Sequence, residues 1–219
     1  MYYFIGEDRN LLIDTGTGIK GIKHILEEID DKPIDVVLTH GHWDHLGNVH
    51  EFKNVYVHKN DLKWVRDGLP LPEEIIKQMM IKDVSNEYLE DFSLQGFTHN
   101  NPKDVSNYSF EELSFIHTPG HSPGSICVYD KQRKILFSGD VVYEGTIYCH
   151  YESTNPRKLY ESIKKISKYD IERIMSGHYN EPSLEIVNDL YNMMEGLEFE
   201  NKLCHGSGLK CKNDICLQL

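Results

Sequence analysis

The most constraining feature of this chain is the run His-Gly-His-Trp-Asp-His at residues 40–45, which directly follows the apolar segment 34–38. That segment predicts a buried strand, so three imidazoles and one carboxylate stand at a strand end. Imidazole nitrogen and carboxylate oxygen suit zinc and related divalent ions. The run contains no cysteine that would favour a closed structural zinc site. It therefore predicts an open, catalytic metal site.

The spacing within the run indicates more than one ion. His40 and His42 are two residues apart, so in an extended segment their side chains point the same way and can bind one ion. A turn or helix after His42 would carry Asp44 and His45 to a second position. Neither site would be complete, because zinc takes about four ligands and a catalytic ion keeps one position for water.

Three downstream segments supply the missing ligands. His121 lies in the turn-rich stretch 118–125, Asp140 closes the apolar run 135–139, and His178 follows a similar run. A carboxylate such as Asp140 can bridge two cations, which one imidazole cannot. His117 precedes His121 by four residues and is predicted to be an ordinary strand residue.

These residues together resemble the metallo-β-lactamase superfamily of metallohydrolases, and the similarity spans residues 2–185. The family signature His-x-His-x-Asp-His matches residues 40–45, and its later His, Asp and His match the three downstream ligands. The resemblance implies one ion on His40, His42 and His121, a second on Asp44, His45 and His178, and Asp140 as the bridge. It also implies that Asp14, in Leu-Ile-Asp-Thr-Gly, supports the ligand loop from behind.

The activity that the resemblance implies is hydrolysis by a binuclear centre of two divalent ions. Zinc is expected, with iron or manganese as alternatives. Two such ions lower the pKa of a shared water towards ~7, so a metal-bound hydroxide can attack an ester-like carbonyl, with a thioester or lactone favoured. Asp44 and Asp140 are predicted to hold the nucleophile. Tyr143 is predicted to donate to the oxyanion, since similar N-acyl homoserine lactone lactonases carry a tyrosine there, although an ordinary strand tyrosine is the competing interpretation.

Other activities of the superfamily stay open. Persulfide dioxygenases share the ligand signature but hold a single iron, which would make the chain an oxidoreductase. A β-lactam or phosphodiester hydrolase is a further alternative. True β-lactamases usually carry cysteine where Asp140 stands, and glutathione-thioester hydrolases use a sizeable C-terminal domain for which only residues after about 185 are available.

Composition narrows the partners and the location. The formal charge of −12, from 35 acidic and 23 basic residues, disfavours nucleic acid and leaves a small-molecule substrate. No apolar stretch approaches the ~20 residues of a membrane span, and the start of the chain does not resemble a signal peptide. Five unevenly spaced cysteines favour a reducing compartment, so a cytoplasmic location is expected. A homodimer is left open.

Alternating apolar patterns predict an α/β protein. Strands are expected at 2–5, 11–14, 34–39, 55–58, 113–116, 125–129, 134–137 and 171–175, and helices at 20–29, 61–66, 73–82, 157–169 and 184–199. The resemblance implies a four-layer αβ/βα sandwich of two mixed sheets flanked by helices. This domain is expected over residues 1–200, with a loosely held tail at 201–219.

A variable insertion, residues 68–107, is expected to line the substrate site. Within it Phe92 and Phe97 stand in a loop containing Gly and polar residues, beside Leu94. Loops of this kind supply substrate-binding side chains and lids in many enzymes. Phe92 and Phe97 are therefore predicted to be lid residues.

Overall fold

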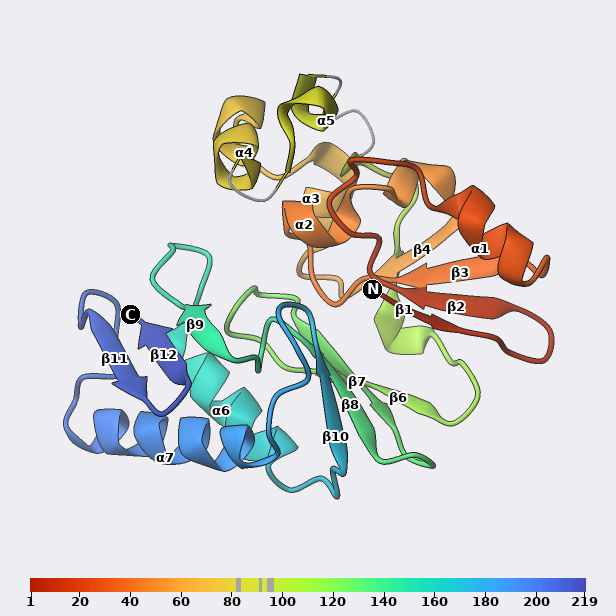
Figure 1. Cartoon of the computed structure of the whole chain (residues 1–219). Coiled ribbons are helices and arrows are strands. Elements are labelled where there is room, and N and C mark those ends of the chain that lie inside the picture. The colour runs from red at the N-terminus through yellow and green to blue at the C-terminus, as the bar shows by residue number, and fades with distance from the viewer. Residues whose placement is uncertain (82–83, 91, 94–96) are drawn as a thin grey trace. The chain divides into compact units, whose positions relative to one another are not determined.

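The computed structural model describes residues 1–81, 84–90, 92–93 and 97–219. The chain divides into two compact units, residues 1–108 and 109–219 (Figure 1). Each unit has its own mixed sheet and its own hydrophobic core. Within the described ranges, no helix combines the length and the apolar character that crossing a membrane requires.

The first unit is built on a five-stranded sheet in which β1 to β5 follow one another in chain order. Its strands are β1 (Tyr2–Phe4), β2 (Asn10–Ile13), β3 (Ile34–Val37), β4 (Asn54–Val57) and β5 (Lys103–Asp104). Strands β1 and β2 form an antiparallel hairpin, and the pairings from β2 to β5 are parallel. All residues of β2 and β3 are buried, as expected for parallel strands covered on both faces.

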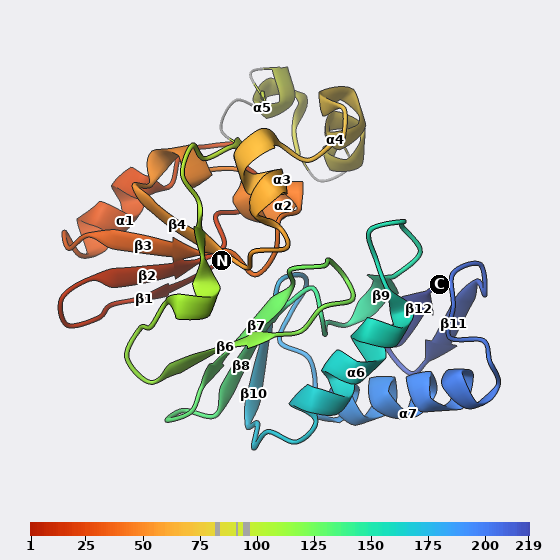
Figure 2. The ribbon, with the colours of Figure 1, turned by 180° about the vertical axis from the view of Figure 1, so that it is seen from behind.

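Short helices connect these strands. They are α1 (Lys23–Ile29), α2 (Trp43–Leu46), α3 (Leu62–Asp67), α4 (Glu73–Met80) and α5 (Asn86–Glu90), with 3-10 turns at Val49–Glu51 and Val105–Asn107. In Figure 2, α1 runs beside the sheet, while α4 and α5 form an outlying pair beyond α3. Helix α4 turns Ile76 and Met80 into the core and leaves Ile75 and Met79 exposed.

The lid prediction for Phe92 and Phe97 is wrong. Both side chains are only 5% exposed, and their rings meet edge to face with centroids 5.5 Å apart. They belong to the core of the first unit together with Ile76 and Met80, because burying two aromatic rings removes a large apolar area from water. Leu94 and Lys82, which the sequence also included in this region, lie outside the described residues.

The second unit contains a four-stranded sheet in the order β10-β8-β7-β6. Its strands are β6 (Leu113–His117), β7 (Ile126–Asp130), β8 (Ile135–Gly139) and β10 (Arg173–Ser176). The first three are antiparallel neighbours, and β10 joins β8 in parallel. His117 ends β6, and its Nε2 lies 3.1 Å from the carbonyl of Pro123, so it is the strand residue that the sequence predicts.

Two helices, α6 (Pro156–Ile166) and α7 (Glu185–Phe199), complete this core. Helix α6 begins after Asn155, whose side chain accepts a hydrogen bond from the Lys158 amide, with Pro156 at the first helical position. Both features are common at helix starts. Cys127 and Cys149 are fully buried, which raises the pKa of each thiol to about 12.

The tail at 201–219 is not loosely held. Strands β11 (Leu209–Lys212) and β12 (Ile215–Gln218) form a hairpin, and β12 pairs in parallel with β9 (Gly145–Tyr148) in a third sheet. Ile215 and Leu217 are buried in the core of the second unit. Cys211 and Cys216 stand opposite each other in the hairpin and form a disulfide, which the cysteine spacing did not predict.

Candidate metal centre

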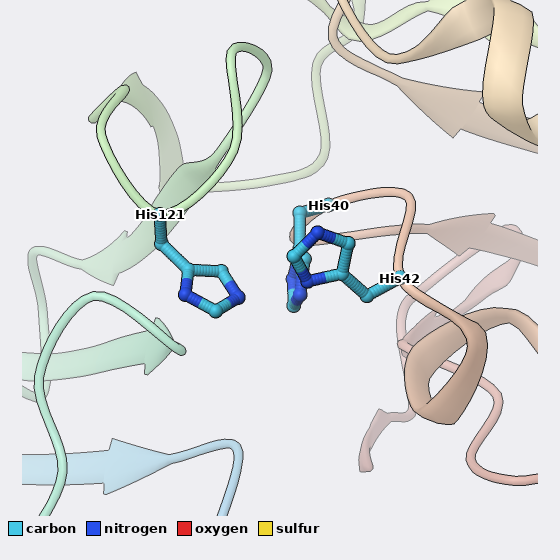
Figure 3. Close-up of side chains that lie close together, drawn as sticks. All are labelled: His40, His42 and His121. Atoms are coloured by element: carbon cyan, nitrogen blue, oxygen red, sulfur yellow. The ribbon is translucent and has the colours of Figure 1, made fainter. Parts of the chain in front are cut away.

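The ligand run changes from extended chain to helix, which is one of the two arrangements that would carry Asp44 and His45 to a second position. His42 is still extended, with φ −82° and ψ 153°, and helix α2 begins at the next residue. The rings of His40 and His42 have centroids 4.5 Å apart, and Figure 3 shows both side chains on the loop after β3. Each offers a nitrogen within 4.8 Å of the other. This pair can bind one ion.

The single turn of α2 brings the other two ligands of the run together. Nε2 of His45 lies 3.7 Å from Oδ2 of Asp44, and the His45 ring lies 4.2 Å from the ring of His40. His45 and His40 are almost fully buried. Four ligand side chains of the first unit therefore form one compact cluster.

Asp14 supports this cluster from behind. Its Oδ2 lies 2.8 Å from Nδ1 of His45, and the same carboxylate accepts hydrogen bonds from the Thr39 amide and hydroxyl at 2.7 and 2.8 Å. The Thr39 oxygen in turn lies 3.1 Å from Nδ1 of His40. Since both Nδ1 atoms face acceptors, each carries the proton, and each Nε2 keeps a lone pair for an ion.

In the second unit, three strand ends converge on one carboxylate. Oδ2 of Asp140, which follows β8, lies 3.0 Å from Nε2 of His178 and 3.5 Å from Nε2 of His121. His178 follows β10, and His121 stands in the loop after β6 (Figure 3). A hydrogen bond from Ser162 of α6 to the carbonyl of Pro119 holds that loop to the helix.

Tyr143 lies beside the candidate ligand His178. Its ring lies 5.5 Å from the His178 ring, but the side chain is buried and its hydroxyl donates to the carbonyl of Thr146 over 2.6 Å. Burial, and next the nearby carboxylate of Asp140, raise the pKa of this phenol well above its ordinary value. The phenol proton is therefore engaged with Thr146 in this structure, which favours the structural interpretation of Tyr143, and the oxyanion role stays a prediction from the sequence.

The donor set fits divalent metal ions. It contains five imidazoles and two carboxylates, the nitrogen and oxygen ligands that suit zinc, and also iron and manganese. Hydrogen bonds behind His40 and His45 orient these ligands in the way that metal-binding imidazoles are commonly oriented.

Two supporting residues were missed by the sequence analysis. Thr39 links His40 to Asp14, and a threonine before a histidine gives no distinctive signal. Asp61 is fully buried and accepts a hydrogen bond from the Gly41 amide over 3.1 Å. In the sequence it is only the first residue of the predicted helix 61–66, which gives no sign of a contact with Gly41.

Comparison with known proteins agrees with this chemistry. The model of the metallo-beta-lactamase superfamily matches residues 1–178. The chain belongs to the metallo-β-lactamase superfamily. Human acyl-coenzyme A thioesterase MBLAC2 is 30% identical over 80% of this chain and 71% of that protein. Hydroxyacylglutathione hydrolase GloC of Haemophilus influenzae is 27% identical over 72% of this chain and 71% of that protein.

A solved structure confirms the fold. TTHA1623 in a di-iron-bound form has a TM-score of 0.63 and 22% identity, covering 84% of this chain and 89% of that one. The predicted α/β metallo-β-lactamase fold, with mixed sheets and flanking helices, is therefore confirmed. Membership of this superfamily and the named hydrolase relatives also support an enzyme with hydrolase activity.

Proposed function

We propose that this chain is a binuclear metal-dependent hydrolase that cleaves thioesters of small acyl compounds. One ion would be held by His40, His42 and His121, the second by Asp44, His45 and His178, and Asp140 would bridge both. The observation that carries this proposal is the hydrogen-bonded support of the imidazoles by Asp14 and Thr39, since such support orients metal ligands.

When bound, two divalent ions supply an activated water near neutral pH and polarise the carbonyl of a substrate. We propose zinc, which suits a set rich in neutral imidazole, and the di-iron form of the structural relative keeps iron as the alternative. Asp44 and Asp140 are the carboxylates of the two clusters. Their part would be to orient the attacking water and to accept its proton.

The choice of a thioester is supported by the two named relatives. One is an acyl-coenzyme A thioesterase and the other a hydroxyacylglutathione hydrolase, and both kinds of substrate join an acyl group to sulfur. A lactone, which the sequence equally favours, presents a similar carbonyl. A cytoplasmic location stays a prediction from the sequence, which leaves a homodimer open.

The test is a substrate panel on protein loaded separately with zinc, iron or manganese. It includes a short and a long acyl-coenzyme A, S-lactoylglutathione, a lactone, a β-lactam, a phosphodiester and a glutathione persulfide. We expect free thiol from the thioesters, activity lost in Asp140→Asn, and activity retained after substitution of His24, an exposed histidine on α1. No thiol release by protein that holds two ions would reject the thioesterase assignment.

A further inference from the structure

A buried carboxylate outside the candidate ligand set contacts the turn at residues 40–42, called here the ligand turn. Asp61 immediately precedes helix α3, is 0% exposed, and its Oδ2 accepts a hydrogen bond from the amide of Gly41 over 3.1 Å. Gly41 is the residue between the ligands His40 and His42. Asp61 therefore contacts the backbone of the turn that presents both imidazoles.

The Asp61 carboxylate does not cap the helix that follows it. Asp61 occupies the N-cap position of α3, where an aspartate side chain commonly accepts a hydrogen bond from the first helical turn. Here no side-chain cap hydrogen bond forms, and the carboxylate faces the ligand turn instead. Burying a charged group is costly unless it is hydrogen-bonded, and the Gly41 amide supplies one such hydrogen bond to Asp61.

The first turn of α3 also packs against the same peptide. A Cβ added to Gly41 would lie 3.2 Å from Cε3 and 3.3 Å from Cβ of Trp64, closer than side chains ordinarily pack, and 3.4 Å from Cβ of Asp61. The indole of Trp64 stacks on the His42 ring with centroids 5.7 Å apart and an interplanar angle of 28°. The backbone at Gly41 and the side chain of His42 therefore both pack against Trp64 of α3.

We propose that Asp61 is a positioning residue for the metal centre. By holding the Gly41 amide it fixes the peptide between the two ligands, and so the directions in which His40 and His42 leave the backbone. The inference rests on the proposed metal binding by these two histidines. It adds α3 as a support for the backbone between His40 and His42, beside the support of the His40 and His45 rings by Thr39 and Asp14.

The test measures metal binding rather than turnover. Zinc affinity is determined by competition with a chromophoric chelator, and the absorption spectrum of the cobalt(II)-loaded protein reports the ligand geometry. Asp61→Ala removes the acceptor, and we expect zinc affinity to fall by at least ~10-fold, with an altered cobalt spectrum. Asp61→Asn keeps an oxygen acceptor without its charge, so we expect a smaller loss.

Asp67→Ala is the matched control. Asp67 ends the same helix and is exposed, where it pairs with Arg66, so zinc affinity and spectrum should stay as in the parent protein. If Asp61→Ala does not fold, Asp61→Asn decides. Either Asp61 variant, folded and with the parent affinity and spectrum, overturns the proposal.

The outcomes also separate this proposal from the proposed function. A parent protein that binds no zinc or cobalt overturns both. A parent protein that binds zinc but releases no thiol overturns only the thioesterase assignment. Parent-like metal binding in a folded Asp61 variant overturns only the role of Asp61.

Discussion

His45 donates a hydrogen bond from Nδ1 to Oδ2 of Asp14 over 2.8 Å, although the two residues are 31 positions apart in the chain. Asp14 reaches this position with a φ of +59°, a conformation that aspartate tolerates better than most residues. The carboxylate also accepts the amide and the hydroxyl of Thr39. Asp14, in the turn after β2, therefore orients His45 directly and His40 through Thr39.

Replacement of Asp14 by asparagine should weaken metal binding. The amide cannot accept all three hydrogen bonds with the strength of a carboxylate, so His45 loses its fixed orientation. We expect zinc affinity at the second ion to fall ~10- to 100-fold, measured by calorimetric titration. Asp31→Asn, at an exposed position, is the control, and equal affinities in the two variants would contradict the role of Asp14.

Two ions per chain are expected at saturation, because all seven ligand positions are filled. His121→Ala should lose mainly the first ion and His178→Ala mainly the second. Elemental analysis after incubation with excess zinc or manganese measures both losses, and His24→Ala should keep two ions. A single ion in the parent protein would reject the binuclear centre.

Asp140→Asn should reduce turnover by at least ~10²-fold even where metal remains. The substitution keeps the size of the side chain but removes the negative charge proposed to hold two cations close together. Steady-state kinetics on fully metallated protein provide the measurement, with the exposed Asp170→Asn as the control. Near-normal turnover would show that Asp140 is not the bridge.

Tyr143→Phe should affect stability more than chemistry. The lost hydrogen bond to the Thr146 carbonyl should cost about 0.5–1.5 kcal/mol of unfolding free energy. We expect kcat to change by less than about threefold, whereas loss of an oxyanion donor would lower it by ~10²-fold or more. Denaturant unfolding and kcat on one thioester distinguish the two roles, and a large fall in kcat at intact metal content would restore the oxyanion interpretation.

Phe97→Ala should destabilise the first unit without changing substrate preference. The buried ring packs against Phe92, and its removal should cost about 3–5 kcal/mol. KM for a short and a long acyl-coenzyme A should then shift by the same factor in protein that remains folded. A selective rise in KM for the long substrate would instead indicate a substrate-binding role.

The sequence by itself determined the candidate ligand run and the positions of most strands in the five-stranded and four-stranded sheets. Residues 40–45 are contiguous, so their change from extended chain to helix follows from local geometry, and the apolar runs of β3 and β8 identify buried strands whatever they pair with. Asp14 could be placed behind the ligands only because the family resemblance named it.

Only the tertiary structure decided what depends on a partner distant in the chain. In the sequence, Phe92 and Phe97 are aromatic residues among polar and Gly residues. Their burial depends on packing against the core to which α4 contributes Ile76 and Met80. The tail forms a strand because β12 pairs with β9, about 70 residues earlier in the chain. The side chain of Asp61 accepts a hydrogen bond from Gly41, which lies 20 positions away in the chain. Local periodicity predicts which face of a helix or strand is buried. It does not predict which acceptor a given donor will bind, because several acceptors in the chain can satisfy the same donor. Tertiary packing decides which of them lies within hydrogen-bond distance.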